Sequence, residues 1–156
     1  MIGISELNNK IMKKEDIEIL VKDLCARLPY NTMIHGVYAY ENPDYDCGRD
    51  PDKILYSEHD SVMLPSDIDW IEMYAADIKP YLFPMSSMTD KQREEYESLC
   101  IKVTSECTEF YTGVTFTTDN FYDTIESFDY LYKNHIDVRG LIDKGLAIDA
   151  TKSKVY

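Results

Sequence analysis

The 156-residue chain has 29 acidic against 16 basic residues, and its net charge of −13 disfavours direct binding to nucleic acid, whose phosphates it would repel. Hydrophobic residues make up 44% and charged residues 29%, which is typical of one globular domain that buries a core without disulfide or metal staples. No apolar run approaches the roughly 20 residues that span a bilayer, and no signal-peptide core follows the N-terminus. Four scattered cysteines without CxxC spacing predict free thiols in a reducing cytoplasm.

The N-terminal half predicts a helix packed on a sheet. Residues 1–14 are expected to be a partly ordered lead-in. Glu15–Leu28 carries one apolar stripe at helical spacing, with Asp23 and Arg27 as a favourable pair on its outer face. Met33–Tyr40 is apolar on both faces, which favours a central strand.

The next segment predicts further strands and leaves one ambiguity. Lys53–Leu64 is interpreted as two short strands about a turn near His59–Asp60. Ser66–Ile78 keeps apolar residues at helical spacing behind an N-cap-like serine, yet the same residues also suit one face of a strand. Both alternatives stay open, with helix favoured.

A proline-bounded segment, Lys79–Gln92, leads from the sheet into a further helix. Pro80 and Pro84 hold a run of large apolar residues extended, and Thr89 with Gln92 forms a capping box. A helix over Asp90–Cys100 is therefore expected.

The C-terminal third predicts strands and then a helix. Ile101–Cys107 and Phe110–Thr117 are rich in strand-forming residues. Asp119–Asn134 stacks aromatic and aliphatic residues at helical spacing, and Val138–Ala150 is expected to be a short helix or turn closed by Gly145 in a left-handed conformation.

These elements predict an α+β fold. Residues 15–150 form one domain, in which three to four helices cover an antiparallel sheet of about four to five strands. Residues 151–156 are expected to fray.

The densest group of catalytic residue types is His135, Asp137 and Arg139. A histidine beside an aspartate could act as a general base, and an arginine could bind an anion. The structural alternative, which is favoured, places a cationic histidine at a helix C-terminus and an arginine that pins the last turn. Walker A, GxGxxG, HExxH and kinase motifs are absent, so common nucleotide-driven chemistry is disfavoured and no cofactor is indicated.

The acidic loop between the first strands invites a calcium interpretation, which fails on spacing. Counted from Asp44, an EF-hand needs glycine at its sixth position and a bidentate acid at its twelfth, but these are Arg49 and Leu55. A weak cation site and a solvated loop both stay open, and no metal site is assigned; the acidic residues are Asp44, Asp46, Asp50 and Asp52.

Thirteen tyrosines favour a binding surface, because tyrosine combines rigid apolar area with a polar tip. A ligand or partner surface is predicted from residues around the sheet and the proline segment. The alternative is that these rings only fill the sheet. The residues are Tyr38, Tyr40, Tyr45, Tyr56, Tyr81 and Phe83.

Two segments carry a resemblance to a known family. They are Lys79–Thr89 (KPYLFPMSSMT) with its following charged helix, and Phe128–Ala147 (FDYLYKNHIDVRGLIDKGLA). In order and separation they resemble the hallmarks of uncharacterised proteins of gut Bacteroidales phages, prophages and mobile elements. The resemblance implies a cytoplasmic accessory protein of such an element, and it implies no site residues because none are established for the family.

Three functions follow, in order of preference. The first is an accessory protein that binds a host or phage protein, for example as a counter-defence inhibitor. The second is a sponge for a small signalling nucleotide, in which a homo-oligomer would gather the chain's few arginines. The third is a small hydrolase-type enzyme using His135, Asp137 and Arg139. Strong acidity, abundant tyrosine and missing motifs support the first.

Overall fold

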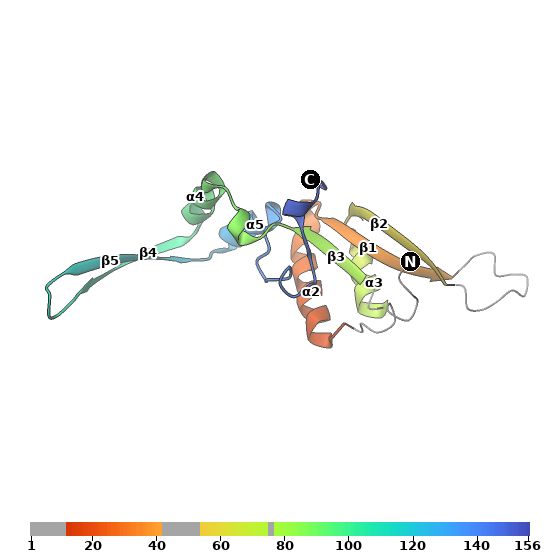
Figure 1. The fold of residues 1–156 in the computed structure, drawn as a ribbon, viewed down its shortest axis with the longest axis horizontal. Coiled ribbons are helices and arrows are strands. Elements are labelled where there is room, and N and C mark those ends of the chain that lie inside the picture. The colour runs from red at the N-terminus through yellow and green to blue at the C-terminus, as the bar shows by residue number, and fades with distance from the viewer. Residues whose placement is uncertain (1–11, 42–53, 75–76) are drawn as a thin grey trace, which may run out of the picture.

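The computed structural model describes residues 12–41, 54–74 and 77–156, and it confirms an α+β fold (Figure 1). A four-stranded sheet in the order β2-β1-β3-β6 forms the body of the molecule, and a separate two-stranded hairpin, β4-β5, projects from it between helices α4 and α5. Within these ranges, no helix is both long and apolar enough to cross a membrane.

The body sheet is mixed rather than wholly antiparallel. Strand β1 (Met33–Glu41) pairs antiparallel with β2 (Ile54–Val62) and with β3 (Asp77–Leu82). The fourth strand, β6 (Ile148–Asp149), is only two residues long and runs parallel to β3. Parallel pairing arises here because the chain returns through α4, the hairpin and α5 before it reaches β6.

The predicted turn near His59–Asp60 is wrong, because β2 is one continuous strand. Its pairing with β1 continues through both residues, with Gly36 opposite His59 and His35 opposite Asp60. The His35 Nδ1 lies 2.9 Å from an Asp60 carboxylate oxygen. The polar residues that suggested a turn form the exposed edge of the sheet instead.

Two helices and the C-terminal segment bury one face of this sheet. Helix α2 (Lys14–Arg27) confirms the first predicted helix, and α3 (Pro65–Tyr74) is followed by β3 from residue 77. The ambiguous segment is therefore helix first and strand afterwards. The fully buried side chains of the core come from α2, α3, β1, β3 and the C-terminal segment: Leu20, Leu24, Ile34, Ile71, Ile78, Leu82 and Leu141.

The proline-bounded segment pairs with the chain after α5. Phe83 forms an isolated parallel bridge with Ile136, in which the Phe83 amide donates to His135 O and its oxygen accepts from the Asp137 amide, each at 2.8 Å. The predicted capping box is confirmed: the Thr89 side chain accepts from the Gln92 amide, and α4 spans Asp90–Leu99. A smaller core of Met88, Leu131 and Ile136 fills the space beneath.

The hairpin changes the predicted boundaries of the C-terminal third. Strand β4 spans Ile101–Thr108, β5 spans Thr115–Tyr122, and α5 spans only Ile125–Lys133. The prediction of a helix from residue 119 is wrong, because residues 119–122 pair with β4 as far as Ile101 opposite Tyr122. The helix then begins at an N-cap, Thr124, whose side chain accepts from the Ser127 amide.

The C-terminus also differs from the expected frayed tail. The Tyr156 hydroxyl accepts from the Met33 amide and donates to the Tyr81 carbonyl, each at 3.0 Å. Its ring is stacked on His135 with a centroid distance of 4.3 Å. One aromatic side chain thus fastens the last residue to β1, β3 and the segment after α5.

Tyr156→Phe should lower the free energy of unfolding by about 1–2 kcal/mol, because an amide and a carbonyl each lose their partner while the ring stays. Urea unfolding followed by circular dichroism measures this. The control is Tyr111→Phe, at a side chain that is 97% exposed on the hairpin, where a change below about 0.5 kcal/mol is expected. Equal stability of Tyr156→Phe and the parent would contradict the docked tail.

Candidate functional site

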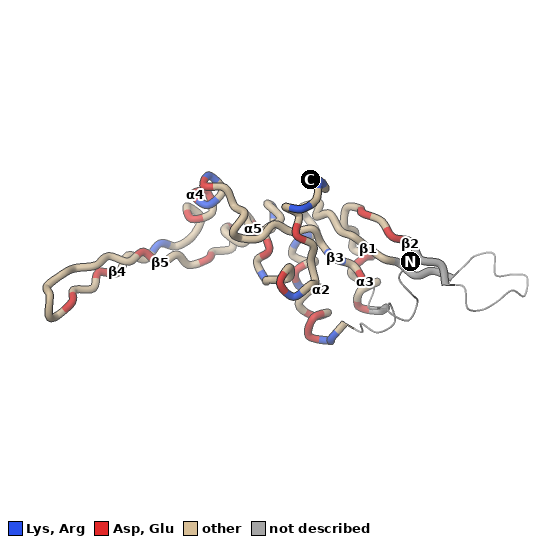
Figure 2. The backbone as a smooth tube through the Cα atoms, viewed as in Figure 1, with Lys and Arg blue, Asp and Glu red and all other residues tan. Residues whose placement is uncertain are grey.

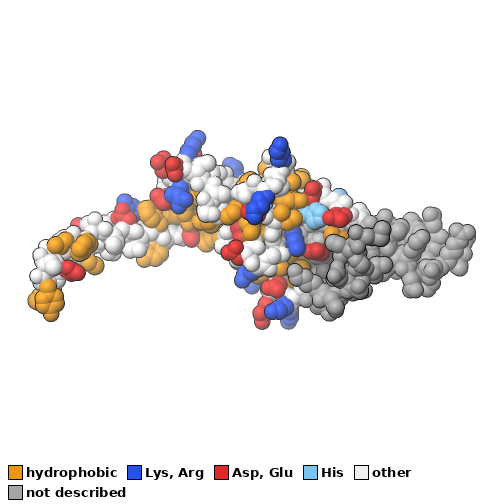
Figure 3. Space-filling view, viewed as in Figure 1, with side chains coloured by type: hydrophobic (Ala, Val, Ile, Leu, Met, Phe, Trp, Pro, Cys, Tyr) orange, Lys and Arg blue, Asp and Glu red, His pale blue; other side chains and the backbone are white. Residues whose placement is uncertain are grey.

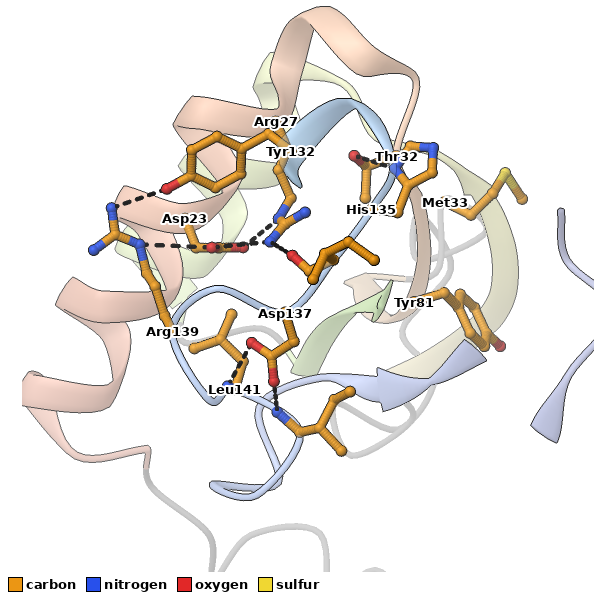
Figure 4. Close-up of polar contacts among 12 residues, drawn as sticks. Asp23, Arg27, Thr32, Met33, Tyr81, Tyr132, His135, Asp137, Arg139 and Leu141 are labelled. Carbon is orange, nitrogen blue, oxygen red and sulfur yellow. Dashed lines mark hydrogen bonds and ion pairs between the residues drawn. The ribbon is translucent and has the colours of Figure 1, made fainter. Parts of the chain in front are cut away.

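A buried ion pair lies where α2 meets the end of α5 (Figure 4). Asp23 and Arg27 are both 0% exposed, and Arg27 Nε donates to Asp23 Oδ2 at 2.5 Å. Arg27 Nη2 donates to the main-chain oxygen of Ile136 at 2.7 Å, and the guanidinium lies 4.9 Å from the centre of the Tyr132 ring. The prediction that this pair lies on the outer face of the helix is wrong, since the C-terminal segment covers it.

Arg139 joins this group from the rim. Its Nε lies 3.6 Å from Asp23 Oδ1, and its Nη2 donates to the Tyr132 hydroxyl at 3.3 Å. Two guanidinium groups therefore share the carboxylate of Asp23, so the arginine pins the chain after α5, in agreement with the structural interpretation of its role.

Asp137 has a local capping role. Its two carboxylate oxygens accept from the amides of Leu141 and Ile142, each at 2.9 Å, and its side chain is buried. The turn between them contains Gly140 at φ +66°, a left-handed conformation that favours glycine. Both oxygens of this carboxylate thus hold the turn together.

His135 is neutral at physiological pH. Burial, followed by the positive charge of Arg27, lowers the pKa of its imidazole from 6.5 to about 4. Its Nδ1 lies 3.3 Å from Thr32 Oγ1. The prediction of a cationic histidine at the helix C-terminus is therefore wrong. Its backbone has φ +56°, which is uncommon for a residue with a side chain and is held here by the bonds to Phe83 and the stack on Tyr156.

The structure does not bring the three proposed catalytic residues together. Figure 4 shows the His135 ring directed toward Thr32, the Asp137 carboxylate toward Leu141, and Arg139 toward Asp23. His135 lines an open pocket of about 320 Å³ with Phe83, Lys133 and Tyr156 among others, but Asp137 and Arg139 do not line it. The hydrolase hypothesis gains no catalytic geometry from this arrangement.

The six predicted binding residues do not form one described surface. Tyr45 lies outside the described residues, as do the side chains of Tyr38, Tyr40 and Tyr56, whose backbones belong to β1 and β2. Tyr81 is 7% exposed, and its hydroxyl donates to Asp60 at 2.8 Å, which with burial raises its pKa to about 12. Phe83 is half-buried, with its ring centroid 5.7 Å from that of Tyr156.

The predicted acidic loop, from Asp44 to Asp52, lies outside the described residues. In the part of the chain that the structure describes, no group of three or more His, Cys, Asp or Glu side chains could hold a metal ion. The described cysteines, Cys25, Cys100 and Cys107, are free thiols, as predicted.

The most exposed apolar surface of the described chain is on the hairpin, residues 101–122, which we call the arm. Directly opposed residues of an antiparallel pair share one face, and alternate residues along each strand share it too. Four such pairs form a face that carries no charge, which we call the apolar face, and no other residue that the structure describes covers its large side chains, which are 42–58% exposed. They are Ile101 with Tyr122, Val103 with Asn120, Ser105 with Thr118, and Cys107 with Phe116.

On the opposite face of the arm, the charged face, Lys102 and Asp119 are paired with each other. Lys102 Nζ lies 2.9 Å from Asp119 Oδ2 and 6.0 Å from the centre of the Phe121 ring. Thr104 Oγ1 donates to Asp119 Oδ1 at 2.7 Å, and the hydroxyls of Thr108 and Thr115 lie 3.1 Å apart. Two-stranded ribbons of this kind are polar toward solvent and apolar toward a covering layer.

The tip of the arm presents two aromatic rings. Phe110 and Tyr111 are 95% and 97% exposed, and their rings meet edge to face at 5.8 Å. The turn behind them is fixed by hydrogen bonds between Glu109 and Val114 and by Gly113 at φ +63°. In Figure 3, hydrophobic side chains lie at this tip and again where the arm meets α4 and α5, with mostly polar side chains between them.

Sequence reasoning missed this site because it placed the second strand at Phe110–Thr117, which includes the turn, and assigned the end of β5 to a helix over residues 119–134. The signal was nevertheless present in β4, where Ile101, Val103 and Cys107 alternate with polar residues. Matched alternation in β5 places Phe116 and Tyr122 on the same side.

Comparison with protein-family models, with curated proteins and with solved structures gives no match for this chain. The resemblance of its two segments to proteins of phages and mobile elements stays a prediction.

Asp23→Ala should lower the free energy of unfolding by about 3–5 kcal/mol, because it leaves the Arg27 guanidinium buried without its carboxylate. Urea unfolding measures the loss. Glu18→Ala is the matched control on the same helix, since the Lys14–Glu18 pair is exposed with 3.9 Å between its charged atoms, and it should cost below about 0.5 kcal/mol. Similar losses for the two variants would contradict the role of the buried pair.

His135 should make stability depend on pH. The pKa of its imidazole is about 4 in the folded chain and 6.5 for an ordinary histidine, so between these values the unfolded chain binds a proton that the folded chain does not. The stabilisation is complete above pH 6.5 and is lost as pH falls toward 4. Thermal unfolding from pH 7 to pH 4 should show a shallower decline for His135→Asn, a residue that tolerates positive φ, than for the parent. Parallel pH profiles would contradict a depressed pKa.

Proposed function

We propose that the protein works by binding another protein, without catalysis, and that the apolar face of the arm makes the contact. The observation that carries this proposal is that a two-stranded ribbon stands away from the body with Lys102 and Asp119 paired on its charged face, while no residue that the structure describes covers its apolar face. An isolated two-stranded hairpin is only marginally stable in water, and a third layer stabilises it. A partner surface would supply that layer.

The charges of the chain favour a protein over nucleic acid or a phosphorylated ligand as the partner. The one basic residue of the arm, Lys102, lies on the charged face and is paired with Asp119. Of the three arginines that the structure describes, Arg27 is buried against Asp23, and Arg139 also lies against that carboxylate. Only Arg93 of α4 lines an open pocket, which gives little support to a nucleotide sponge.

An accessory role in a phage or mobile element, including inhibition of a host protein, fits the same mode of action. Such a protein would act by occupying a surface of its target, and a projecting arm with an apolar face and aromatic tip is suited to that. The composition of the arm supports it, since aromatic residues are enriched and charged residues depleted at the centres of protein interfaces.

Affinity capture with an arm variant and a neighbouring control tests this proposal. The tagged chain is co-expressed in bacteria with an untagged copy and recovered from lysate, so that binding to itself and to other proteins is detected together. Phe116→Lys places a charge on the apolar face, whereas Thr117→Lys adds the same charge one residue later on the charged face.

The parent and Thr117→Lys should retain the same protein in near-stoichiometric amounts, and Phe116→Lys should retain roughly tenfold less or lower, because a buried unpaired charge opposes binding. Capture of no stoichiometric protein by the parent, or equal capture by both variants, would overturn the proposal.

A further inference from the structure

We infer that the surface which covers the apolar face of the arm is the same face of a second copy of this chain, with the two arms antiparallel. This inference rests on the proposed function and names its partner. The two arms would then form a four-stranded pair of layers related by a twofold axis, and the two bodies would lie at its opposite ends.

Charge is the first argument for a second copy. Figure 2 shows acidic residues distributed over the helices and the body, consistent with the net charge of −13. Two copies would repel each other through most surfaces. The apolar face is free of charge over all four of its residue pairs, whereas Lys102, Glu106 and Asp119 all lie on the other face. Copies can therefore approach through these faces with the least repulsion.

The order of residues along the face is the second argument. Its two ends are apolar, with Ile101 and Tyr122 near the base and Cys107 and Phe116 near the tip, while its middle holds Val103 and three polar, uncharged residues. When two such faces are overlaid antiparallel about their common centre, the base of one arm lies on the tip of the other. The two middle pairs of one copy then lie on those of the other, so that Asn120 faces Thr118, where amide and hydroxyl groups can bond.

The tip and the base provide the third argument. In the antiparallel overlay, the turn of one arm extends past the base of the other and reaches the start of its α5. Exposed apolar side chains lie at both places: Phe110 and Tyr111 at the tip, and Ile125, which is 78% exposed, with the partly exposed Phe128 in α5. A parallel overlay would instead place tip on tip and base on base, and it would bring the two acidic bodies together at one end, where they repel each other.

The available area suits a stable dimer. Four aromatic side chains of each copy take part, and aromatic rings bury roughly 150–250 Å² each, so they supply on the order of 600 Å² per copy. The aliphatic residues of the face and the base bring this toward the roughly 800 Å² per partner of a standard interface. The aromatic residues are Phe110, Tyr111, Phe116 and Tyr122, each more than half exposed.

Mass measurement of the purified full chain tests the partner. The mass is measured by sedimentation equilibrium or light scattering from about 1 to 100 μM, a range that resolves micromolar affinity. The parent and Thr117→Lys should both have a mass of twice 18.2 kDa. Phe116→Lys should remain at 18.2 kDa or require at least tenfold higher concentration to dimerise. Val103→Lys, in the middle of the same face, should behave as Phe116→Lys does, with Thr104→Lys on the charged face as its control.

Cross-linking tests the antiparallel arrangement. Serine replaces Cys25, Cys47 and Cys100, so that Cys107 is the remaining thiol, and a short bis-maleimide is added. Ile101→Cys should cross-link two copies through Cys107 of the other arm, whereas Lys102→Cys, on the charged face, should not. Residues 101 and 107 of one strand lie roughly 20 Å apart, which exceeds the reach of a short linker within one chain.

The outcomes separate this inference from the proposed function. A monomer throughout the concentration range, with arm-dependent capture of a different protein, would overturn the second copy and leave the function standing. A monomer that captures nothing would overturn both. A dimer that survives Phe116→Lys and Val103→Lys would place the contact elsewhere and overturn this inference. Cross-linking of Cys107 in one copy to Cys107 in the other, without Ile101→Cys, would overturn the antiparallel arrangement.

Discussion

The buried contact between Asp23 and Arg27 is the constraint on which the rest of the structure depends. Arg27 lies on the first described helix, yet it donates to the main-chain oxygen of Ile136 and lies against the Tyr132 ring. A buried guanidinium must keep these partners, so α2 fixes the position of the chain after α5. That chain pairs with Phe83, from which α4 and the arm begin. The base of the arm is thereby held by the core of the body.

The body and the arm solve the burial of apolar residues in different ways. In the body, helices and sheet cover each other, and the polar groups of Asp23, Asp137 and Tyr156 bond to main-chain or charged partners. In the arm, every residue of β5 is exposed, and the internal bonds of the charged face hold the ribbon in shape. A covering partner would add the apolar contacts that two strands alone lack, which favours the use of the ribbon as a contact element.

The elements that depend on interactions between residues close in the sequence could be predicted from the sequence. The first helix, strand β1 and the Thr89–Gln92 capping box follow from spacing and capping within a few residues. The misses all depend on distant partners. Asp23 and Arg27 have the spacing of an exposed pair, and only the chain more than a hundred residues later buries them. Residues 119–122 fit a helical pattern, but pairing with β4 makes them a strand. Tyr156 has no local signal at all, because its partners lie on β1 and β3.

The distribution of charge connects the fold to its proposed use. A chain with net charge −13 resists association through most of its surface, which keeps a protein with exposed aromatic residues soluble. The apolar face of the arm is exempt from this repulsion, because the alternation of β4 and β5 sends every charge of the two strands to the other face. In the dimer that we propose, association would therefore be directed to one face by repulsion elsewhere as much as by apolar contact there. A charge introduced on that face removes both effects at once, whereas a charge on the opposite face changes neither.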